Sequence, residues 1–337
     1  MLRWEDVLER ARESLKGICH LCPVCDMRAC AGKVPGIGGI GTGSSAKNNY
    51  EALRGLKFKM KLLHDVDKPD MGVELFGQKL ALPVIGAAVA GAKVNFAAKI
   101  AEKEFAQAQL VGAMEAGTIA MIGDGPGDLY DDTIAALREA GKGIAIIKPR
   151  EFDEIMRRIK MAEEAGALAV GIDVDAAGLV NMRRSGELVR PLNPNILKRI
   201  CESSNLPVIV KGIMAEEEAV MACDAGASAI VVSNHGGRVL DDLPGTISVL
   251  PGIASRVRGR CIVLADGGVR TGSDVLKFLA CGASAVLVGR PVVWGVFGGG
   301  KEGVRLLYER LAQELSVAMM LTSCPSVREV SHCISGN

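Results

Sequence analysis

The chain places a histidine and an arginine three residues apart, in the segment Ser233-Asn234-His235-Gly236-Gly237-Arg238, which directly follows the apolar run 229–232. An imidazole exchanges a proton near neutral pH, and a guanidinium holds a carboxylate through two parallel hydrogen bonds. Together at the end of a buried strand, they indicate a site for an acid whose neighbouring carbon is oxidised or deprotonated. The alternative is an ordinary polar loop, because short motifs also arise by chance.

Eight short apolar runs follow residue 80, and amphipathic stretches such as 152–165, 215–225 and 272–280 lie between them. The runs are residues 82–87, 118–122, 143–147, 167–172, 207–210, 229–232, 261–265 and 285–288. Continuously apolar strands are typical of parallel sheets covered on both faces, and strands that alternate with helices form parallel sheets. Eight such units favour a closed (β/α)8 TIM barrel over an open sheet.

Polar side chains stand directly after these runs, where barrel enzymes carry their reactive groups. They are Asp173, Asp175, Lys211, His235, Arg238, Asp266 and Arg290. Lys211 suits a partly buried point charge, which would steady negative charge on a cofactor ring or form a Schiff base. The alternative for Lys211 is an ion pair at the rim with Asp173 or Asp175. The distribution as a whole indicates an active site.

Glycine and arginine follow the last two strands, in Asp266-Gly267-Gly268-Val269-Arg270 and in Gly289-Arg290. Loops at these two places in a barrel often bind phosphate, because backbone N–H groups and a helix start point at the anion. The two arginines add positive charge, and Asp266 suits ribityl or ribose hydroxyls. The alternative is ordinary turn chemistry.

These motifs resemble those of the FMN-dependent α-hydroxy acid dehydrogenases and oxidases, the group of glycolate oxidase, lactate oxidase and flavocytochrome b2. The matching segments are residues 206–213, 233–238, 266–270 and 289–291, in the order and nearly at the spacing of that family. A weaker likeness extends back through Asp175, residues 82–88 and residues 49–53. The resemblance implies an enzyme that oxidises a small 2-hydroxy acid, similar to lactate or glycolate, to the 2-oxo acid.

The resemblance also implies roles for single residues. His235 would take the proton of the substrate hydroxyl, Arg238 would hold the substrate carboxylate, and Asp175 would orient and stabilise the charged His235. Lys211 would sit against the N1/O2 edge of the flavin and stabilise the reduced ring. The remaining cofactor contacts would be Ala87 and Ala88 beside N5, Ser233 at the ring or ribityl chain, and Asp266, Gly268, Arg270, Gly289 and Arg290 at the ribityl phosphate.

The substrate side departs from the family pattern. The position of one family tyrosine falls on Ile147, and the tyrosine of the N-terminal region has no counterpart. Asp124 and Gly125 follow the second strand, where the family carries serine or threonine and often an aromatic residue. The second arginine for the substrate carboxylate would be Arg183 or Arg184. Lys148 is a site for an extra anion or an ordinary surface lysine.

Two alternatives to hydroxy acid oxidation stay open. One is another chemistry on a flavin barrel, such as an FMN-dependent isomerase, against which His235 and Arg238 argue. The other is a non-catalytic flavin or iron–sulfur redox protein, which the missing tyrosines keep open.

Four cysteines stand within twelve residues, Cys19, Cys22, Cys25 and Cys30, with gaps of two, two and four residues. Such spacing is typical of an iron–sulfur cluster or a zinc site, although it matches neither standard pattern in full. The alternative is free or redox-active thiols. A cluster would relay electrons from the flavin to a partner and make the protein a dehydrogenase.

The nearby run 36–41 satisfies G-x-G-x-x-G but follows no strand, so we expect a flexible loop near the barrel mouth.

The composition narrows the remaining classes. A net charge of +1 and 4% aromatic residues give no basis for binding nucleic acid or an anionic membrane surface, and no apolar run is long enough to span a bilayer. Ten cysteines without a secretory signal predict a reducing compartment, the cytoplasm. We expect an N-terminal extension over 1–80, with an amphipathic helix over 1–16, and a barrel over 81–337 closed by a helix over 302–321, which follows a loop at Gly298-Gly299-Gly300-Lys301. The resemblance implies a homotetramer or octamer, and the electron acceptor stays open between O2 and a redox protein.

Overall fold

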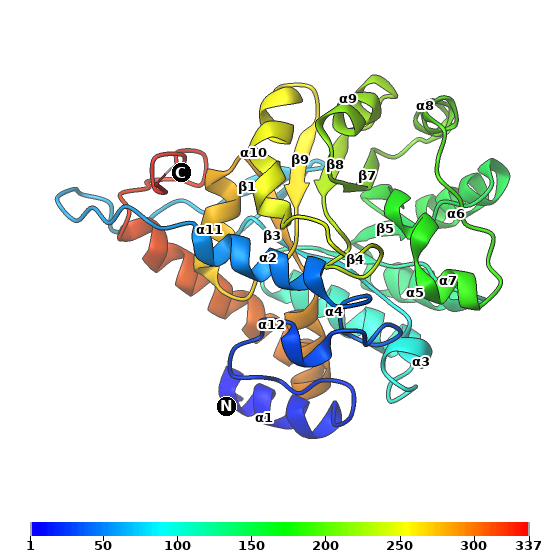
Figure 1. Cartoon of the computed structure of the whole chain (residues 1–337), viewed down its shortest axis with the longest axis horizontal. Helices are drawn as coiled ribbons and strands as arrows, with labels where there is room; N and C mark the ends of the chain where they lie inside the picture. The colour runs from blue at the N-terminus through cyan, green and yellow to red at the C-terminus, as the bar shows by residue number, and fades with distance from the viewer. Residues whose placement is uncertain (1, 336–337) are drawn as a thin grey trace.

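The eight apolar runs form eight parallel strands that close into a barrel in the computed structural model, which describes residues 2–335 (Figure 1). Around the barrel the strand order is β10-β3-β4-β5-β6-β7-β8-β9, so each strand pairs with its neighbours in sequence and β10 closes onto β3. The strands are β3 (Val84–Val89), β4 (Ala120–Ile122), β5 (Ile144–Ile147), β6 (Ala169–Asp173), β7 (Val208–Ile213), β8 (Ala229–Val232), β9 (Ile262–Ala265) and β10 (Ala285–Val288). The predicted (β/α)8 TIM barrel is confirmed.

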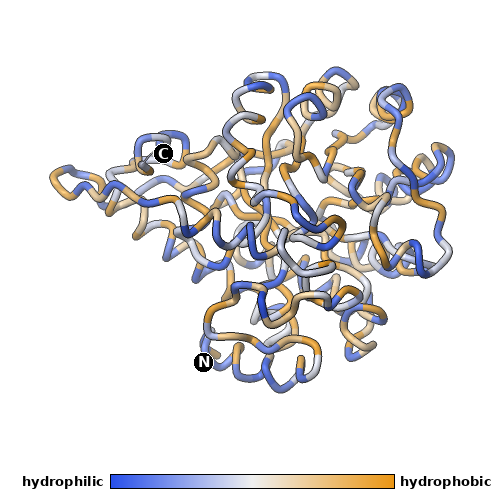
Figure 2. The backbone as a smooth tube through the Cα atoms, in the orientation of Figure 1, coloured by the Kyte–Doolittle hydropathy of each residue, from blue (hydrophilic) through white to orange (hydrophobic). Residues whose placement is uncertain are grey.

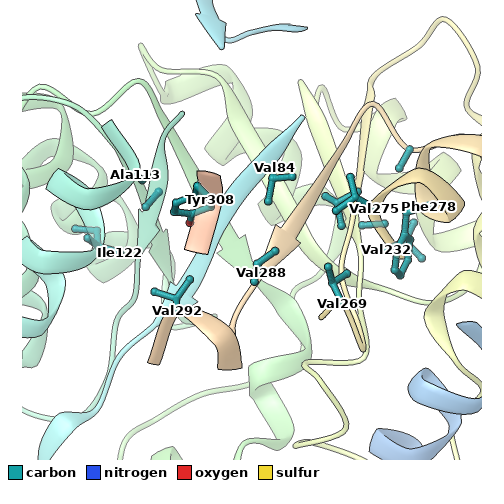
Figure 3. Close-up of a cluster of buried hydrophobic side chains, with 14 of the residues drawn as sticks. Val84, Ala113, Ile122, Val232, Val269, Val275, Phe278, Val288, Val292 and Tyr308 are labelled. Carbon is teal, nitrogen blue, oxygen red and sulfur yellow. The ribbon is translucent and has the colours of Figure 1, made fainter. Parts of the chain in front are cut away.

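Side chains alternate between the two faces of each strand, because successive residues of a strand point in opposite directions. On β8, Ala229 and Val231 belong to the cluster that fills the barrel, whereas Ile230 and Val232 pack outward with the helices. Figure 3 shows the outer layer, in which Val84, Val232 and Val288 lie beside side chains of the surrounding helices. Burial on both faces explains why these runs are continuously apolar.

A ring of helices covers the outer face of the barrel, one principal helix after each strand (Figure 1). The helices are α4 (Glu102–Glu115), α5 (Leu129–Ala140), α6 (Phe152–Glu164), α8 (Pro194–Ser203), α9 (Glu216–Asp224), α10 (Thr246–Arg256), α11 (Gly272–Ala280) and α12 (Arg290–Met320). Figure 2 shows hydrophobic colouring along the central strands and alternating colouring on the peripheral helices, as amphipathic helices require.

The C-terminal helix differs from the prediction. We expected a loop through Gly298–Gly300 and a helix from residue 302, but α12 already begins at Arg290 and is interrupted only at Gly300, whose φ is 57°. The glycines serve helix packing, because a Cβ at Gly298 would collide with the backbone of Val7 on α1 (Trp4–Ser14). Glycine here allows α1 to lie directly against α12.

The first eighty residues hold α1, the 3-10 helix η1 (Arg28–Cys30), α2 (Ser44–Gly55) and the hairpin of β1 (Val73–Leu75) and β2 (Gln78–Leu80). Leu75 and Leu80 of the hairpin join the cluster inside the barrel and close its amino-terminal end. Short elements also follow two barrel strands: α3 (Ala92–Asn95) after β3, and η2 (Val174–Gly178) with α7 (Val180–Arg184) after β6. Within residues 2–335, none of the helices combines the length and apolar character needed to cross a membrane.

The packing of α11 on α12 generates a stability prediction. A Cβ at Gly272 would lie against the backbone of Leu311 and Leu315, so we expect Gly272→Ala to lower the free energy of unfolding by about 1–3 kcal/mol. Gly55→Ala is the matched control, because nothing lies within 4 Å of its Cβ position and helical alanine is favoured over glycine. Urea unfolding of both variants measures the effect, and equal stability of the Gly272 variant and the unsubstituted protein would contradict the packing argument.

Candidate active site

A cavity opens at the carboxyl ends of the barrel strands, and most of the predicted site residues line it. They are Ala87, Ala88, Lys211, His235, Arg238, Asp266, Gly268, Arg270, Gly289 and Arg290. Asp175 and Ser233 do not line the cavity but contact residues that do. These side chains come from loops far apart in the sequence, and closure of the barrel brings them together.

His235 is held by a carboxylate on one ring nitrogen. Its Nδ1 lies 2.8 Å from Oδ1 of Asp175, in η2. An acceptor at this position fixes the proton on Nδ1 and leaves the lone pair on Nε2. His235 has a φ of 56° and is followed by Gly236 and Gly237 at 64° and 75°. A non-glycine residue in the left-handed region is uncommon and marks a site where the chain is constrained.

A buried carboxylate lies next to this pair. Oδ1 of Asp173 is 2.9 Å from Nζ of Lys211 and 3.5 Å from Nδ1 of His235, and Oδ2 is 2.6 Å from Nζ of Lys148. Burial opposes ionisation, but the neighbouring His235 and the positive charges of Lys148 and Lys211 hold the pKa of Asp173 well below its usual range. The ion pair that we considered as an alternative for Lys211 is therefore present, and Lys148 is buried in the site.

Arg238 and Arg290 carry positive charge without an acidic partner among the described residues. Arg238 donates to the carbonyl of Gly36 and to Oδ1 of Asn95 at 3.1 Å, and Arg290 donates to the carbonyls of Ile37 and Gly38 at 2.7 and 3.0 Å. Burial, with repulsion from a neighbouring arginine, lowers the pKa of Arg238 to about 9 and that of Arg290 to about 10. Two buried and mutually repelling cations favour an anion between them.

Ser233 and Asp266 form a buried pair beneath the cavity. Ser233 donates from Oγ to Oδ1 of Asp266 at 2.7 Å and accepts from the backbone N–H of His235 at 3.1 Å. Burial raises the pKa of Asp266. Ser233 thus positions Asp266 and His235, and its expected contact with the ring or ribityl chain stays a prediction.

Arg270 follows two glycines with φ of 112° and 87°, a turn that other residues rarely adopt. Its guanidinium lies over the ring of Trp294, 5.6 Å from the ring centre, and donates to Sγ of Cys25 at 3.4 Å. Its buried Nε has no protein partner within the described residues. Arg270 therefore lies between the cavity and the cysteine segment.

The glycine-rich run 36–41 lies at the barrel mouth, as expected. Gly36 and Ile37 line the cavity, and the backbone N–H of Ile40 donates to the carbonyl of Gly237 at 2.8 Å. The loop follows no strand, in agreement with its interpretation as a loop and not a dinucleotide motif. Its carbonyls accept the hydrogen bonds of Arg238 and Arg290, so it covers the positive end of the site.

Sequence reasoning missed two asparagines. Asn181 donates to Oδ1 of Asn95 at 3.0 Å, and the same oxygen accepts from Arg238. Oδ1 of Asn181 is buried and has no protein partner in residues 2–335, which leaves an acceptor beside the cavity. No pattern in the sequence marks Asn95, because it lies in a short helix remote from the motifs.

The expected second arginine is absent from the cavity wall. Arg183 donates to the carbonyl of Ala177, and Arg184 does not line the cavity either.

Asp124 does not leave a free negative charge in the site. Its carboxylate accepts from Arg150 at 2.7 Å and from Arg158 at 2.9 Å.

Cys19, Cys22, Cys25 and Cys30 line a second, smaller cavity, together with Ile37, Arg290 and Trp294. The structure thus brings the four predicted ligands to one place.

Comparisons with known proteins agree with this geometry. The model of the FMN-dependent dehydrogenase family matches residues 37–195 and 184–335. A peroxisomal (S)-2-hydroxyacid oxidase of Arabidopsis thaliana is 32% identical over 87% of this chain and 88% of its own. A 4-hydroxymandelate oxidase of Amycolatopsis orientalis is 36% identical, with 86% and 89% covered. A solved structure of mandelate oxidase with (S)-2-phenylpropionate is 32% identical, covers 99% of this chain and 98% of its own, and superposes with a TM-score of 0.78.

The buried ion pairs predict a pH-dependent stability. Asp173→Asn leaves Lys148 and Lys211 buried without their partner, so we expect a loss of roughly 3–5 kcal/mol near neutral pH. Because the pKa of Asp173 is lower in the folded than in the unfolded chain, this contribution is complete above about pH 4 and disappears as the pH falls through the folded value. Urea unfolding across pH measures it, with Asp67→Asn at an exposed position as the control. A difference that stays constant down to the lowest pH would contradict the assignment.

Proposed function

The chain belongs to the FMN-dependent dehydrogenase family, and from this premise we propose that it oxidises a small 2-hydroxy acid to the 2-oxo acid with FMN as its cofactor. The observation that carries the proposal is the pairing of His235 with Asp175 beside Arg238, on the wall of a cavity with excess positive charge. His235 supplies the base, Arg238 the anchor for the carboxylate, and Lys211 on the same wall the cation for a reduced ring.

The residues present fit FMN. Arg290 has no acidic partner in the described chain, Arg270 has an unpartnered buried Nε, and Gly267 and Gly268 keep the backbone open beside them. These features suit a phosphate dianion, which accepts charge-assisted hydrogen bonds from arginine and backbone N–H groups. Ala87 and Ala88 at the end of β3 leave a small apolar surface for a ring. When bound, FMN supplies an electron-accepting ring.

His235 acts as the general base in this proposal. With Nδ1 held by Asp175, Nε2 takes the proton of the substrate hydroxyl, and the carboxylate stabilises the imidazolium that forms. Arg238 holds the substrate carboxylate, which binds a guanidinium more strongly than do the neutral carbonyls of Gly36 and Gly38 that now accept its hydrogen bonds. Lys211 keeps its charge, because Asp173, Asp175 and Asp266 outweigh burial and raise its pKa.

The substrate side supports a proposal for specificity. No tyrosine lines the cavity within residues 2–335, and its wall instead carries Asn181 and Lys148. The unpartnered Oδ1 of Asn181 accepts a hydrogen bond from a second donor group of the substrate in this proposal, distinct from the hydroxyl that His235 deprotonates. Lys148 is buried on the same wall, and in this proposal it attracts a second anionic group of the substrate. The particular hydroxy acid is left to a substrate panel.

Two features support proposals about assembly and location. Met60, Leu62 and Leu63 are exposed on a segment that protrudes from the body of the protein in Figure 1, and exposed apolar side chains of this kind suit an interface between copies. We therefore propose a homotetramer or octamer. None of the ten cysteines forms a disulfide within the described residues, which supports a reducing compartment such as the cytoplasm.

The cysteine segment supports a second cofactor. We propose that Cys19, Cys22, Cys25 and Cys30 bind a metal centre, an iron–sulfur cluster or a zinc ion, because they line one cavity. Thiolates are preferred ligands of both.

His235→Ala tests the proposed function. We expect the rate of anaerobic flavin bleaching by the best hydroxy acid of a panel to fall roughly 10²–10⁴-fold, since the base for the hydroxyl proton is lost. Stopped-flow absorbance measures this rate, and the flavin content of the variant controls for cofactor loss. A loss smaller than tenfold would contradict the role of His235. If no acid bleaches the unsubstituted flavoprotein, the oxidation proposal itself is wrong.

A further inference from the structure

The four cysteines line one small pocket. Cys19, Cys22, Cys25 and Cys30 share its wall with Trp294 and Arg290, and the remaining lining residues are Ile18, His20, Met27, Ala29 and Ile37. Leu21 and Met27 adopt left-handed backbone conformations between the cysteines, at φ of 41° and 70°. These turns fold a short segment back on itself, so that residues three to five apart in sequence present their thiols to the same space.

N–H groups stand around the sulfur atoms. The backbone N–H of Leu21 donates to Sγ of Cys19 at 3.5 Å, and Arg270 donates to Sγ of Cys25 at 3.4 Å. Nε1 of Trp294 is buried beside the thiol of Cys19 but makes no hydrogen bond of normal geometry in the described chain, and Trp294 is only 8% exposed. A buried donor that faces a cysteine sulfur on the wall of this cavity suits a sulfur that accepts a hydrogen bond. Hydrogen bonds to sulfur are also a recurring means of tuning iron–sulfur clusters.

The spacing of the thiols distinguishes between a single ion and a cluster. Tetrahedral zinc with Zn–S bonds of about 2.3 Å requires its sulfurs to lie about 3.8 Å apart. Among residues 2–335, no three of these sulfurs lie within 4.8 Å of one another. A four-iron cluster places its metals between the ligands and therefore accepts sulfurs that lie farther apart. The arrangement favours the cluster over zinc.

The cavity lined by the cysteines shares a wall with the flavin cavity, the cavity at the carboxyl ends of the strands where we propose that FMN binds. Ile37 and Arg290 line both, and Arg270 lines the flavin cavity while contacting Cys25. Ile37 and Arg290 therefore lie between the two cavities. Val24, between two of the cysteines, is 58% exposed, so the cysteine segment also reaches the protein surface. The cluster site therefore lies between the flavin cavity and the exterior.

We propose that Cys19, Cys22, Cys25 and Cys30 bind a four-iron, four-sulfide cluster that passes electrons from the flavin to a one-electron carrier protein. The four thiols lose their protons as the Fe–S bonds form. Each hydroxy acid then loses two electrons and two protons; two carrier molecules gain one electron each, and the protons go to solvent, one of them through His235. The electron route rests on the proposed function, whereas the cluster site does not.

Metal analysis of the anaerobically purified full chain is the first test. We expect about four iron and about four acid-labile sulfide per chain, with an electron paramagnetic resonance signal after dithionite reduction. Cys22→Ala should lose iron and sulfide but retain FMN. Cys201→Ala, which changes a half-buried thiol on α8, should retain both. Zinc without sulfide, or no iron even after reconstitution with ferrous iron and sulfide, would overturn the cluster.

Two further measurements test its setting and its role. Trp294→Phe should keep the iron content but make the reduction potential of the cluster more negative, because a hydrogen bond to sulfur is lost. An unchanged potential would contradict the contact between Trp294 and the cluster site.

Addition of the hydroxy acid without oxygen should produce the reduced-cluster signal in the unsubstituted protein. In His235→Ala only dithionite should do so. A cluster that dithionite reduces but the hydroxy acid does not would leave the site intact and overturn the electron route.

Discussion

The carboxylate of Asp173, buried between three basic side chains, is the interaction on which the rest of the site depends. Lys148 follows β5, Asp173 ends β6, Lys211 lies on β7 and His235 follows β8, so one carboxylate ties together the ends of four neighbouring strands. Without it, the two buried ammonium groups of Lys148 and Lys211 would repel each other in a medium that solvates them poorly. With it, Lys211 keeps its charge at the cavity wall and His235 stays beside Asp175.

Excess positive charge organises the opposite side of the cavity. Arg238 and Arg290 are satisfied by carbonyls of the glycine-rich run 36–41, which supplies partial negative charge without a full one. The N-terminal extension therefore does two things: it closes the barrel mouth, and it leaves these guanidiniums available to stronger acceptors. The same extension carries the four cysteines, so the glycine loop connects the anion site to the sulfur-lined cavity.

The substrate side of the cavity departs from the pattern that the family resemblance implies, although the barrel itself is of the expected type. Where the family resemblance leads one to expect tyrosines and a second arginine, the wall carries Asn181 and Lys148, and Arg183 instead bonds a nearby carbonyl. Asp124 is neutralised by Arg150 and Arg158, so it supports the wall and does not repel a negatively charged substrate. The loop after β8 thus carries both the proposed base His235 and the proposed carboxylate anchor Arg238, whereas Lys148 and Asn181 follow β5 and β6.

The sequence by itself determined the barrel and the identity of most cavity residues, because continuously apolar strands, alternating helices and strand-end motifs depend on local order along the chain. It could not show that Asp173 joins Lys148 to Lys211, that Lys148 is buried, or that Asn95 accepts hydrogen bonds from both Asn181 and Arg238, because these contacts join loops from different strands. Gly298–Gly300 looked like a loop because glycine disfavours helices, yet α1 packs closely enough on α12 to require it. Propensity acts between neighbours in sequence, whereas ion pairing and close packing act between neighbours in space, and only the closed barrel decides which residues those are.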